Sequence, residues 1–509
     1  MTQTESILKS LEELHYEIST ESRLVRVGLK EEQNLQKILS KYPALTQLEV
    51  YQELKETPSR QGDPDQKELL ERLAFSCLEL VLHNQIAALD DSFETFLAKT
   101  TVEVDQENIV YHDLYPRIQR ENDFSKRDRL GQAVQKVHHK GSSYLIQMME
   151  KELAFLNQQA QFPDYITYCQ QKKKLDYPKL QDILWDSQQR MRELYHAHMQ
   201  RWLDEEIKKP LGSISRWHSA YLMKIKQFDE LFPKKGFLKR IGKTFTALGI
   251  DLSLYKNIHL DLEDRPRKNP RACCYGSKIP QEVHLIMKPV GGHSDYETFL
   301  HEAGHALHNA HTDPTLPYEY RHLSRSNALS ETYAFLLQNI TMNTEWLVRL
   351  MEIDRATARK IRYYRVLIDL YMFRRYVAKF TAELRFFQQG NLNNGNLYAT
   401  TLTELTQFIY DPVSYLFDMD SEFYSADYLR AWITEAQLER FLVEKFDLTW
   451  WSNRKVKDLL VSWWQNGEKQ EPEQLIGDLG LKPFDLSPLE DRFQELEQLG
   501  LTTRIQKEP

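Results

Sequence analysis

Two histidines four positions apart, with a glutamate directly after the first, form the motif in this chain best suited to chemistry. They are His301, Glu302 and His305, in the pattern H-E-x-x-H. On a helix, residues four apart lie on one face one turn apart, so both imidazoles can bind a single tetrahedral zinc ion. Glu302 would lie beside the pair, where its carboxylate can take a proton from water at the metal. We therefore expect a zinc site with one ion per chain.

A third ligand can come from His311 or from Glu331. His311 occupies the last place of the longer pattern H-E-x-x-H-x-x-G-x-x-H, but His308 replaces the glycine that turns the chain toward the metal. On a continuing helix, His311 would lie about 15 Å along the axis from the first ligand. Glu331 follows a loop with two prolines, and a returning helix could bring it to the metal, leaving a fourth position for water. We predict Glu331 as the ligand; the alternative is an ordinary glutamate in the first turn of a helix.

The chain that positions these residues is expected to be mainly helical. Gly 18 and Pro 19 in 509 residues are below the usual shares of about 7% and 5%. Apolar residues recur at helical spacing except at about 256–290, where short alternating runs predict a small sheet. We expect an N-terminal helical lobe at 1–205 and a catalytic helical lobe at 206–509 that contains the sheet. The arginine-rich stretch 355–385 is interpreted as a solvated or salt-bridged helix face.

Composition excludes several classes of protein. The net charge of −8 argues against nucleic acid as a main partner. No apolar run reaches the ~18 residues of a membrane span, and the first residues lack the pattern of a signal peptide. We therefore expect a cytoplasmic protein with no membrane partner. The four cysteines are too few and too oddly spaced for a disulfide framework, so we predict free thiols.

The stretch Val283–His308 resembles the catalytic core of the thimet oligopeptidase and oligoendopeptidase F family of zinc peptidases. That family has H-E-x-G-H-x-x-H after an edge strand and a glutamate ligand on the next helix, the gluzincin arrangement. The specific match covers about residues 258–340. The resemblance implies a mainly helical, two-lobed fold with a small sheet beside the active-site helix. It also implies a deep channel with zinc at its floor, which admits short unstructured peptides.

A weaker match at 423–438 is similar to the family's tyrosine-rich loop, which faces the zinc. Tyr424 and Tyr428 are the residues onto which the motif maps. The resemblance implies that one of them donates a hydrogen bond to the scissile carbonyl as it becomes an oxyanion. The family's histidine is missing, with Met419 near its place, and the loop glycines are absent. Which tyrosine is the donor therefore stays open, and the alternative for each is a packed aromatic side chain.

The function expected from these residues is a zinc metallopeptidase, an oligopeptidase that hydrolyses internal bonds of short peptides. One alternative is a related zinc carboxypeptidase, which needs a cation for the terminal carboxylate of its substrate; Arg325 is a candidate. A second alternative is a non-catalytic peptide-binding protein with a vestigial metal site. The sequence does not distinguish a monomer from a homo-oligomer.

Five further residues near the motif have two interpretations each. His308 could support the metal site or lie on the surface. Gly291 and Gly292 could allow a peptide backbone to approach closely or could form a simple turn. The adjacent Cys273 and Cys274 are interpreted as apolar filler of a strand, with a redox role as the alternative.

Overall fold

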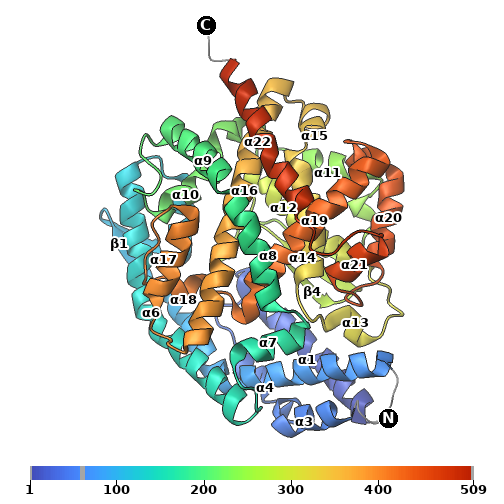
Figure 1. Cartoon of the computed structure of the whole chain (residues 1–509). Helices are drawn as coiled ribbons and strands as arrows, with labels where there is room; N and C mark the ends of the chain where they lie inside the picture. The colour runs from blue at the N-terminus through green and yellow to red at the C-terminus, as the bar shows by residue number, and fades with distance from the viewer. Residues whose placement is uncertain (1–2, 58–63, 506–509) are drawn as a thin grey trace.

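The chain folds into long helices with two small sheets (Figure 1). The computed structural model describes residues 3–57 and 64–505. The helices before the larger sheet are α1 (Gln3–Arg26), α2 (Leu35–Leu39), α3 (Leu48–Glu56), α4 (Pro64–Lys99), α5 (Tyr111–Arg120), α6 (Phe124–Gln158), α7 (Tyr165–Lys173), α8 (Tyr177–Arg190), α9 (Arg192–Glu206), α10 (Arg216–Leu222) and α11 (Phe237–Leu248). Those after it are α12 (His293–His311), α13 (Tyr318–His322), α14 (Ala328–Gln338), α15 (Thr344–Arg349), α16 (Arg355–Gln389), α17 (Gly395–Thr406), α18 (Tyr415–Asp418), α19 (Tyr424–Phe446), α20 (Arg454–Trp464), α21 (Pro472–Asp478) and α22 (Ser487–Ile505). The prediction of a mainly helical fold is confirmed.

The larger sheet lies where the alternating pattern predicted it. Its strands are β3 (Ile258–Asp261), β4 (Cys273–Lys278) and β5 (Glu282–Ile286), in the order β3-β5-β4. Strand β5 pairs in parallel with β3 and antiparallel with β4, so β4 forms an edge of the sheet, next to α1 and α12. A second sheet, the hairpin of β1 (Thr101–Val104) and β2 (Glu107–Val110), lies within the part of the chain expected to be wholly helical.

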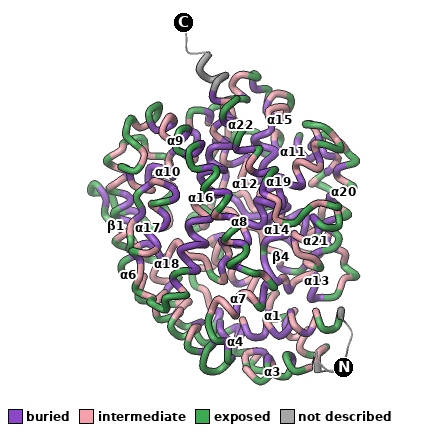
Figure 2. Tube along the Cα trace, viewed as in Figure 1, coloured by how far each residue is buried: buried purple, intermediate pink, exposed green. Residues whose placement is uncertain are grey.

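Buried residues concentrate along α12, α14, α16 and α19 in the middle of the molecule (Figure 2). One large cluster of buried apolar side chains joins residues on both sides of position 205, among them Leu78, Trp202, Phe299 and Trp432. The lobe boundary at 205 therefore stays a prediction. Within the described residues, no helix is both long and apolar enough to cross a lipid bilayer.

Stretch 355–385, interpreted as a solvated or salt-bridged helix face, contains two arginines that are buried rather than solvated, and one of these is salt-bridged. Arg365 and Arg374 are buried. Arg365 forms an ion pair with Glu297 of α12, while Arg374 donates hydrogen bonds to backbone carbonyls of Leu405 and Gln188. The hydrogen-bond partners of these guanidinium groups come from distant parts of the chain, and this allows the charges to be buried.

Helices α12 and α14 approach each other closely at Gly304. A Cβ atom added at this glycine would lie 2.5 Å from Cα of Ala334 and 2.6 Å from the carbonyl oxygen of Tyr333. Both are backbone positions, and real Cβ contacts of that length are essentially never seen. The absence of a side chain at residue 304 therefore sets the distance between the two helices.

We predict that Gly304→Ala destabilises the protein by about 1–3 kcal/mol, the usual cost of overpacking a core. The control is Gly242→Ala in α11, where an added Cβ has no neighbour within 4 Å. That change should instead stabilise by about 0.5–1 kcal/mol, because alanine favours the helix over glycine. Thermal unfolding measures both variants, and a melting temperature of Gly304→Ala equal to that of the native chain would contradict the close contact.

Candidate active site

The three predicted metal ligands lie together. His301 and His305 are one turn apart on α12, and Glu331 lies on the first turn of α14. Nε2 of His301 is 3.4 Å from Oε2 of Glu331, and Nε2 of His305 is 3.8 Å from Oε1 of the same carboxylate. One ligand atom from each residue lies within 4.8 Å of the other two, and no second such group occurs among the described residues.

Hydrogen bonds orient both imidazoles toward the shared point. Nδ1 of His301 lies 2.8 Å from Oε1 of Gln338, and Nδ1 of His305 lies 2.8 Å from Oγ of Ser330. Both partners can accept a hydrogen bond from Nδ1–H, which leaves the Nε2 lone pairs free to bind a metal. Gln338 and Ser330 belong to α14, so the helix that carries the carboxylate also orients the histidines.

The carboxylate of Glu331 is held on one side only. The Tyr424 hydroxyl donates to Oε1 at 2.5 Å. The other oxygen, Oε2, is buried and has no hydrogen-bond partner within the part of the chain that the structure describes. A buried carboxylate oxygen without a partner is costly, and a cation between it and the two imidazoles would satisfy it. Two imidazole nitrogens and one carboxylate oxygen are the donor set of catalytic zinc sites, so the residues fit zinc.

Burial controls the protonation of these side chains. It lowers the pKa of His301 and of His305 to about 4, so both rings are neutral near pH 7 and able to act as ligands. Burial also raises the pKa of Glu302 to about 8, an effect that the negative charge of Glu331 increases and that Arg26 and Arg271 oppose. Glu302 can therefore gain and lose a proton near neutral pH.

Tyr424 and Tyr428 begin helix α19 and face the same cavity as the motif residues. The Tyr424 hydroxyl is engaged by Glu331. The Tyr428 hydroxyl forms no hydrogen bond with any described residue, while its ring packs against Tyr376 and Phe335. Burial and the charge of Glu331 raise the pKa of Tyr428 well above its ordinary value, so its hydroxyl stays protonated and able to donate.

The segment before Tyr424 is held in an unusual backbone conformation. Glu422 and Phe423 both have left-handed φ angles, of 51° and 52°, which cost free energy for residues other than glycine. The Glu383 carboxylate of α16 holds both ends of the segment: it accepts from the backbone N–H of Asp420 at 3.0 Å and from the Ser425 hydroxyl at 2.5 Å.

Helix α7 holds the middle of the same segment. The Tyr168 hydroxyl and the Lys172 ammonium group donate to the two carboxylate oxygens of Glu422, at 2.9 and 2.5 Å. The backbone N–H of Glu422 donates to the Tyr165 hydroxyl at 2.9 Å. These contacts offset the cost of the left-handed conformation and position the two tyrosines.

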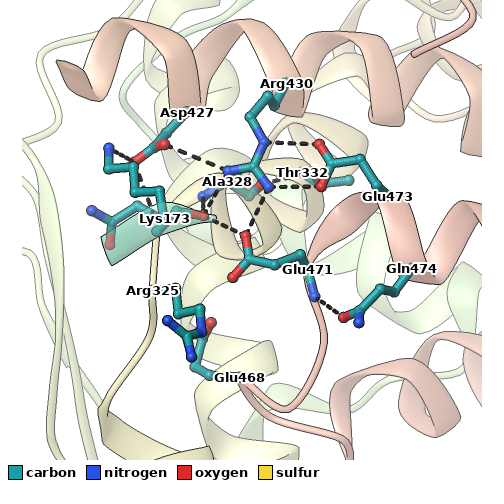
Figure 3. Close-up of polar contacts among 12 residues, drawn as sticks. Lys173, Arg325, Ala328, Thr332, Asp427, Arg430, Glu468, Glu471, Glu473 and Gln474 are labelled. Atoms are coloured by element: carbon teal, nitrogen blue, oxygen red, sulfur yellow. Dashed lines mark hydrogen bonds and ion pairs between the residues drawn. The ribbon is translucent and has the colours of Figure 1, made fainter. Parts of the chain in front are cut away.

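A buried ion network fixes the start of α14 against α19 (Figure 3). Asp427 accepts from Lys173 of α7 at 2.9 Å and from the backbone N–H of Asn327, which precedes α14. Arg430, one turn further along α19, donates to Glu471 and Glu473 at 2.8 and 2.7 Å. The turn that carries Glu331 is thereby linked to three other helices.

The remaining candidates lie outside the metal site. His311 contacts the Tyr255 hydroxyl at 3.0 Å, and His308 is buried with Nε2 3.3 Å from the carbonyl oxygen of Gly467. The interpretation of His308 as a surface residue is therefore wrong. Gly291 and Gly292 form a turn before α12, with φ near 100°. The described cysteines, including Cys273 and Cys274 of β4, are free thiols.

The motif residues line a cavity of about 1810 Å³. Helices α5, α6 and α10 contribute one part of its wall, and β4, α12, α14 and α19 contribute another. His301, Glu302, His305 and Glu331 all reach it. Edge strand β4 runs along the wall, where an extended chain could add to the sheet.

Solved structures share this fold, although no family model matches the sequence and no curated protein matches it. A structure assigned as an oligoendopeptidase F from Bacillus anthracis str. Ames aligns with a TM-score of 0.62 at 14% identity, over 92% of this chain and 83% of that one. PZ peptidase A, in a structure with an inhibitor, aligns with a TM-score of 0.69 at 12% identity, over 98% and 96%. At such low identity the likeness shows the fold. The expected mainly helical fold, with its small sheet beside the motif helix, is confirmed. A large cavity lies where the deep channel was expected.

Sequence reasoning missed three residues that support the site. Ser330 directly precedes Glu331, and Gln338 follows it by two helical turns, so their position on the ligand helix was a usable signal. Glu383 lies on α16, about 40 residues before the segment it holds. No local pattern marks it.

We predict that Ser330→Ala weakens zinc binding about 10- to 100-fold, because His305 loses the partner that orients it. Ser452→Ala is the control: its hydroxyl is exposed and bonds only to the local carbonyl of Thr449. Competition with a zinc-chelating dye measures the affinity of both variants. Equal affinities would show that the Ser330 hydroxyl does not support the ligand.

Proposed function

We propose that this protein is a zinc-dependent oligopeptidase that hydrolyses internal bonds of short, unstructured peptides. The observation that carries the proposal is the convergence of His301, His305 and Glu331, with Glu302 beside them, on the wall of a cavity large enough for a peptide. The structural likeness to peptidases of low sequence identity supports it. The expectation from the sequence motif and the arrangement of the side chains agree.

Zinc, when bound by His301, His305 and Glu331, would supply Lewis-acid chemistry and lower the pKa of water at the fourth position. Gln338 and Ser330 keep the two imidazoles in the tautomer that offers Nε2. Tyr424 holds one oxygen of Glu331, which leaves the other for the metal.

Glu302 is the proposed general base. Its carboxylate lies on the ligand helix directly after His301 and faces the cavity. Its ionised carboxylate can accept a proton from the attacking water, and because burial raises its pKa it can hold that proton and return it to the leaving amine. The same residue thus serves both halves of the reaction.

Tyr428 is the proposed donor to the oxyanion that forms at the scissile carbonyl. Its hydroxyl is protonated and forms no hydrogen bond with the residues that the structure describes. The Tyr424 hydroxyl, in contrast, is already used by Glu331. A positioned O–H group at that point lowers the barrier because it stabilises charge that develops only in the transition state.

The structure offers little for the carboxypeptidase alternative through Arg325. Its guanidinium group is buried in ion pairs with Glu68 and Glu71, at 2.8 and 2.7 Å, and also donates to the carbonyl of Lys172. It has no free side for a substrate carboxylate. The vestigial-site alternative conflicts with a complete set of ligands and a proton acceptor beside them, because losing any one would disable catalysis.

We predict that Glu302→Gln lowers peptide hydrolysis at least about 100-fold at equal zinc content, because the proton acceptor is lost. A mixed library of short peptides, read by mass spectrometry, measures both the loss and the position of the cuts. Glu444→Gln on the exposed face of α19 is the control. Cuts one residue from the C-terminus would favour the carboxypeptidase. Absence of cutting by the native, zinc-loaded chain would favour the vestigial-site protein.

We predict that Tyr428→Phe and Tyr424→Phe have different effects. Loss of the Tyr428 hydroxyl should lower kcat about 100- to 1000-fold and leave zinc affinity unchanged. Loss of the Tyr424 hydroxyl should weaken zinc binding, because Glu331 loses its partner. Steady-state kinetics and zinc titration of the two variants separate the roles. The reverse pattern would assign the oxyanion to Tyr424.

A further inference from the structure

The cavity contains a guanidinium group without a partner close to the metal site. Most arginines that line the cavity bind carboxylates or carbonyls; these are Arg26, Arg117, Arg216, Arg321 and Arg375. Among the described residues, the side chains of Arg120 and Arg271 form no ion pair or hydrogen bond. The field of Arg120 acts on Asp229 and Asp295, near the start of α12. Arg271 differs because its positive charge acts on Glu302 and Tyr428, the proposed catalytic groups.

Arg271 precedes β4, the strand that runs along the cavity wall, and its side chain is exposed. Its positive charge interacts with Tyr428 and Tyr424 and opposes the rise that burial causes in the pKa of Glu302 and of Glu331. Arg271 lines the same cavity as Glu302, Glu331 and Tyr428. A peptide held at the zinc site would pass beside it.

Arg26 fixes the backbone at this point. Nη2 of this residue, at the end of α1, donates to the carbonyl oxygen of Arg271 at 3.0 Å. The backbone carbonyl oxygen of Arg26 also accepts from the N–H of Asn269, two residues before Arg271, at 2.9 Å. The positive charge of Arg26 thus lies against the backbone of Arg271. Arg26 and Arg271 both line the cavity, so two positive charges lie at its edge beside β4.

The acidic groups nearby do not neutralise Arg271 directly. Asp420 acts on the charge of Arg271, but its Oδ2 atom is bound to Lys379 at 2.5 Å. Glu331 is bound by Tyr424 and belongs to the metal site. Arg271 is therefore a charged hydrogen-bond donor in a cavity, and a carboxylate from a ligand would satisfy it in a bidentate contact.

We propose that Arg271 binds a carboxylate of the peptide substrate beside the bond that is cleaved. This inference rests on the proposed peptidase function and names its substrate class: peptides with a carboxylate, at the C-terminus or on an acidic side chain, close to the scissile bond. The size of the cavity leaves room for a chain that continues on the other side of the zinc site. Peptides with the carboxylate a few residues from the cut would be the favoured substrates.

The first experiment compares kcat/KM of the zinc-loaded full chain on four matched peptides. One pair differs only in a free or amidated C-terminus, and one amidated pair differs only in an internal Glu or Gln. We expect the carboxylate member of one pair to be cleaved about 10- to 100-fold faster, the size of a hydrogen bond to a charged group. The pair that shows the preference identifies the source of the carboxylate. Equal rates within both pairs would overturn the proposal.

The second experiment replaces Arg271. In Arg271→Gln the ratio of kcat/KM for the carboxylate peptide to kcat/KM for its neutral partner should fall toward one. Arg271→Lys should restore part of this ratio. Arg267→Gln is the control, because Arg267 lies four residues earlier, is exposed and pairs with Glu31 at the surface. The control should keep the full preference. A preference that survives in Arg271→Gln would assign the carboxylate to another residue and reject the inference.

A binding measurement separates this inference from the peptidase proposal. The zinc-loaded Glu302→Gln chain, which binds without cutting, is titrated with the acid and amide peptides by calorimetry. Tighter binding of the carboxylate peptide that is lost with Arg271→Gln supports the subsite even if the native chain cuts no peptide. Equal binding of both peptides rejects the subsite even if the native chain is an active peptidase.

Discussion

The close contact between helices α12 and α14 determines the geometry of the whole site. Gly304 lets the backbone of α14 lie against α12, and the ligands of the candidate metal site come from these two helices alone. The same contact brings Gln338 and Ser330 to the far sides of the two imidazoles. A wider separation would remove the carboxylate from the histidines and the histidines from their orienting partners together. The absence of a side chain at Gly304 therefore keeps the three ligand side chains and their two orienting partners in place.

Charges buried around the site are matched by partners from distant parts of the chain. Lys173, Asp427 and Arg430 form a chain of ion pairs that links α7, α19 and α21. A buried charge that loses its partner costs several kcal/mol, so these groups are satisfied only when the helices are correctly placed. Such a network favours one arrangement of the helices over others that an apolar interface would tolerate. We infer that it fixes the position of the turn that carries Glu331.

The sequence predicted what depends on local spacing. The pair His301 and His305 follows from helical geometry alone, and the alternating run near 256–290 predicted the sheet. The hairpin β1–β2 was missed because its turn is Asp105-Gln106, without the glycine that usually marks such turns, although both residues adopt positive φ. The burial of Arg365 was also missed, because its partner Glu297 is 68 residues away and no periodicity reports a tertiary ion pair.

The segment 420–425, which positions Tyr424 and Tyr428, is held by parts of the chain that contribute no metal ligand. The proposed ligands and the groups that orient them all come from residues after 290. The partners of Glu422 come instead from α7, within the N-terminal 205 residues. Damage to α7 therefore removes no proposed ligand, but it releases the segment that positions Tyr424 and Tyr428 and breaks the Lys173 contact to Asp427. A lesion in the first half of the chain would thus weaken both the hydrogen bond that holds Glu331 and the positioning of the proposed oxyanion donor, although every proposed ligand lies in the second half.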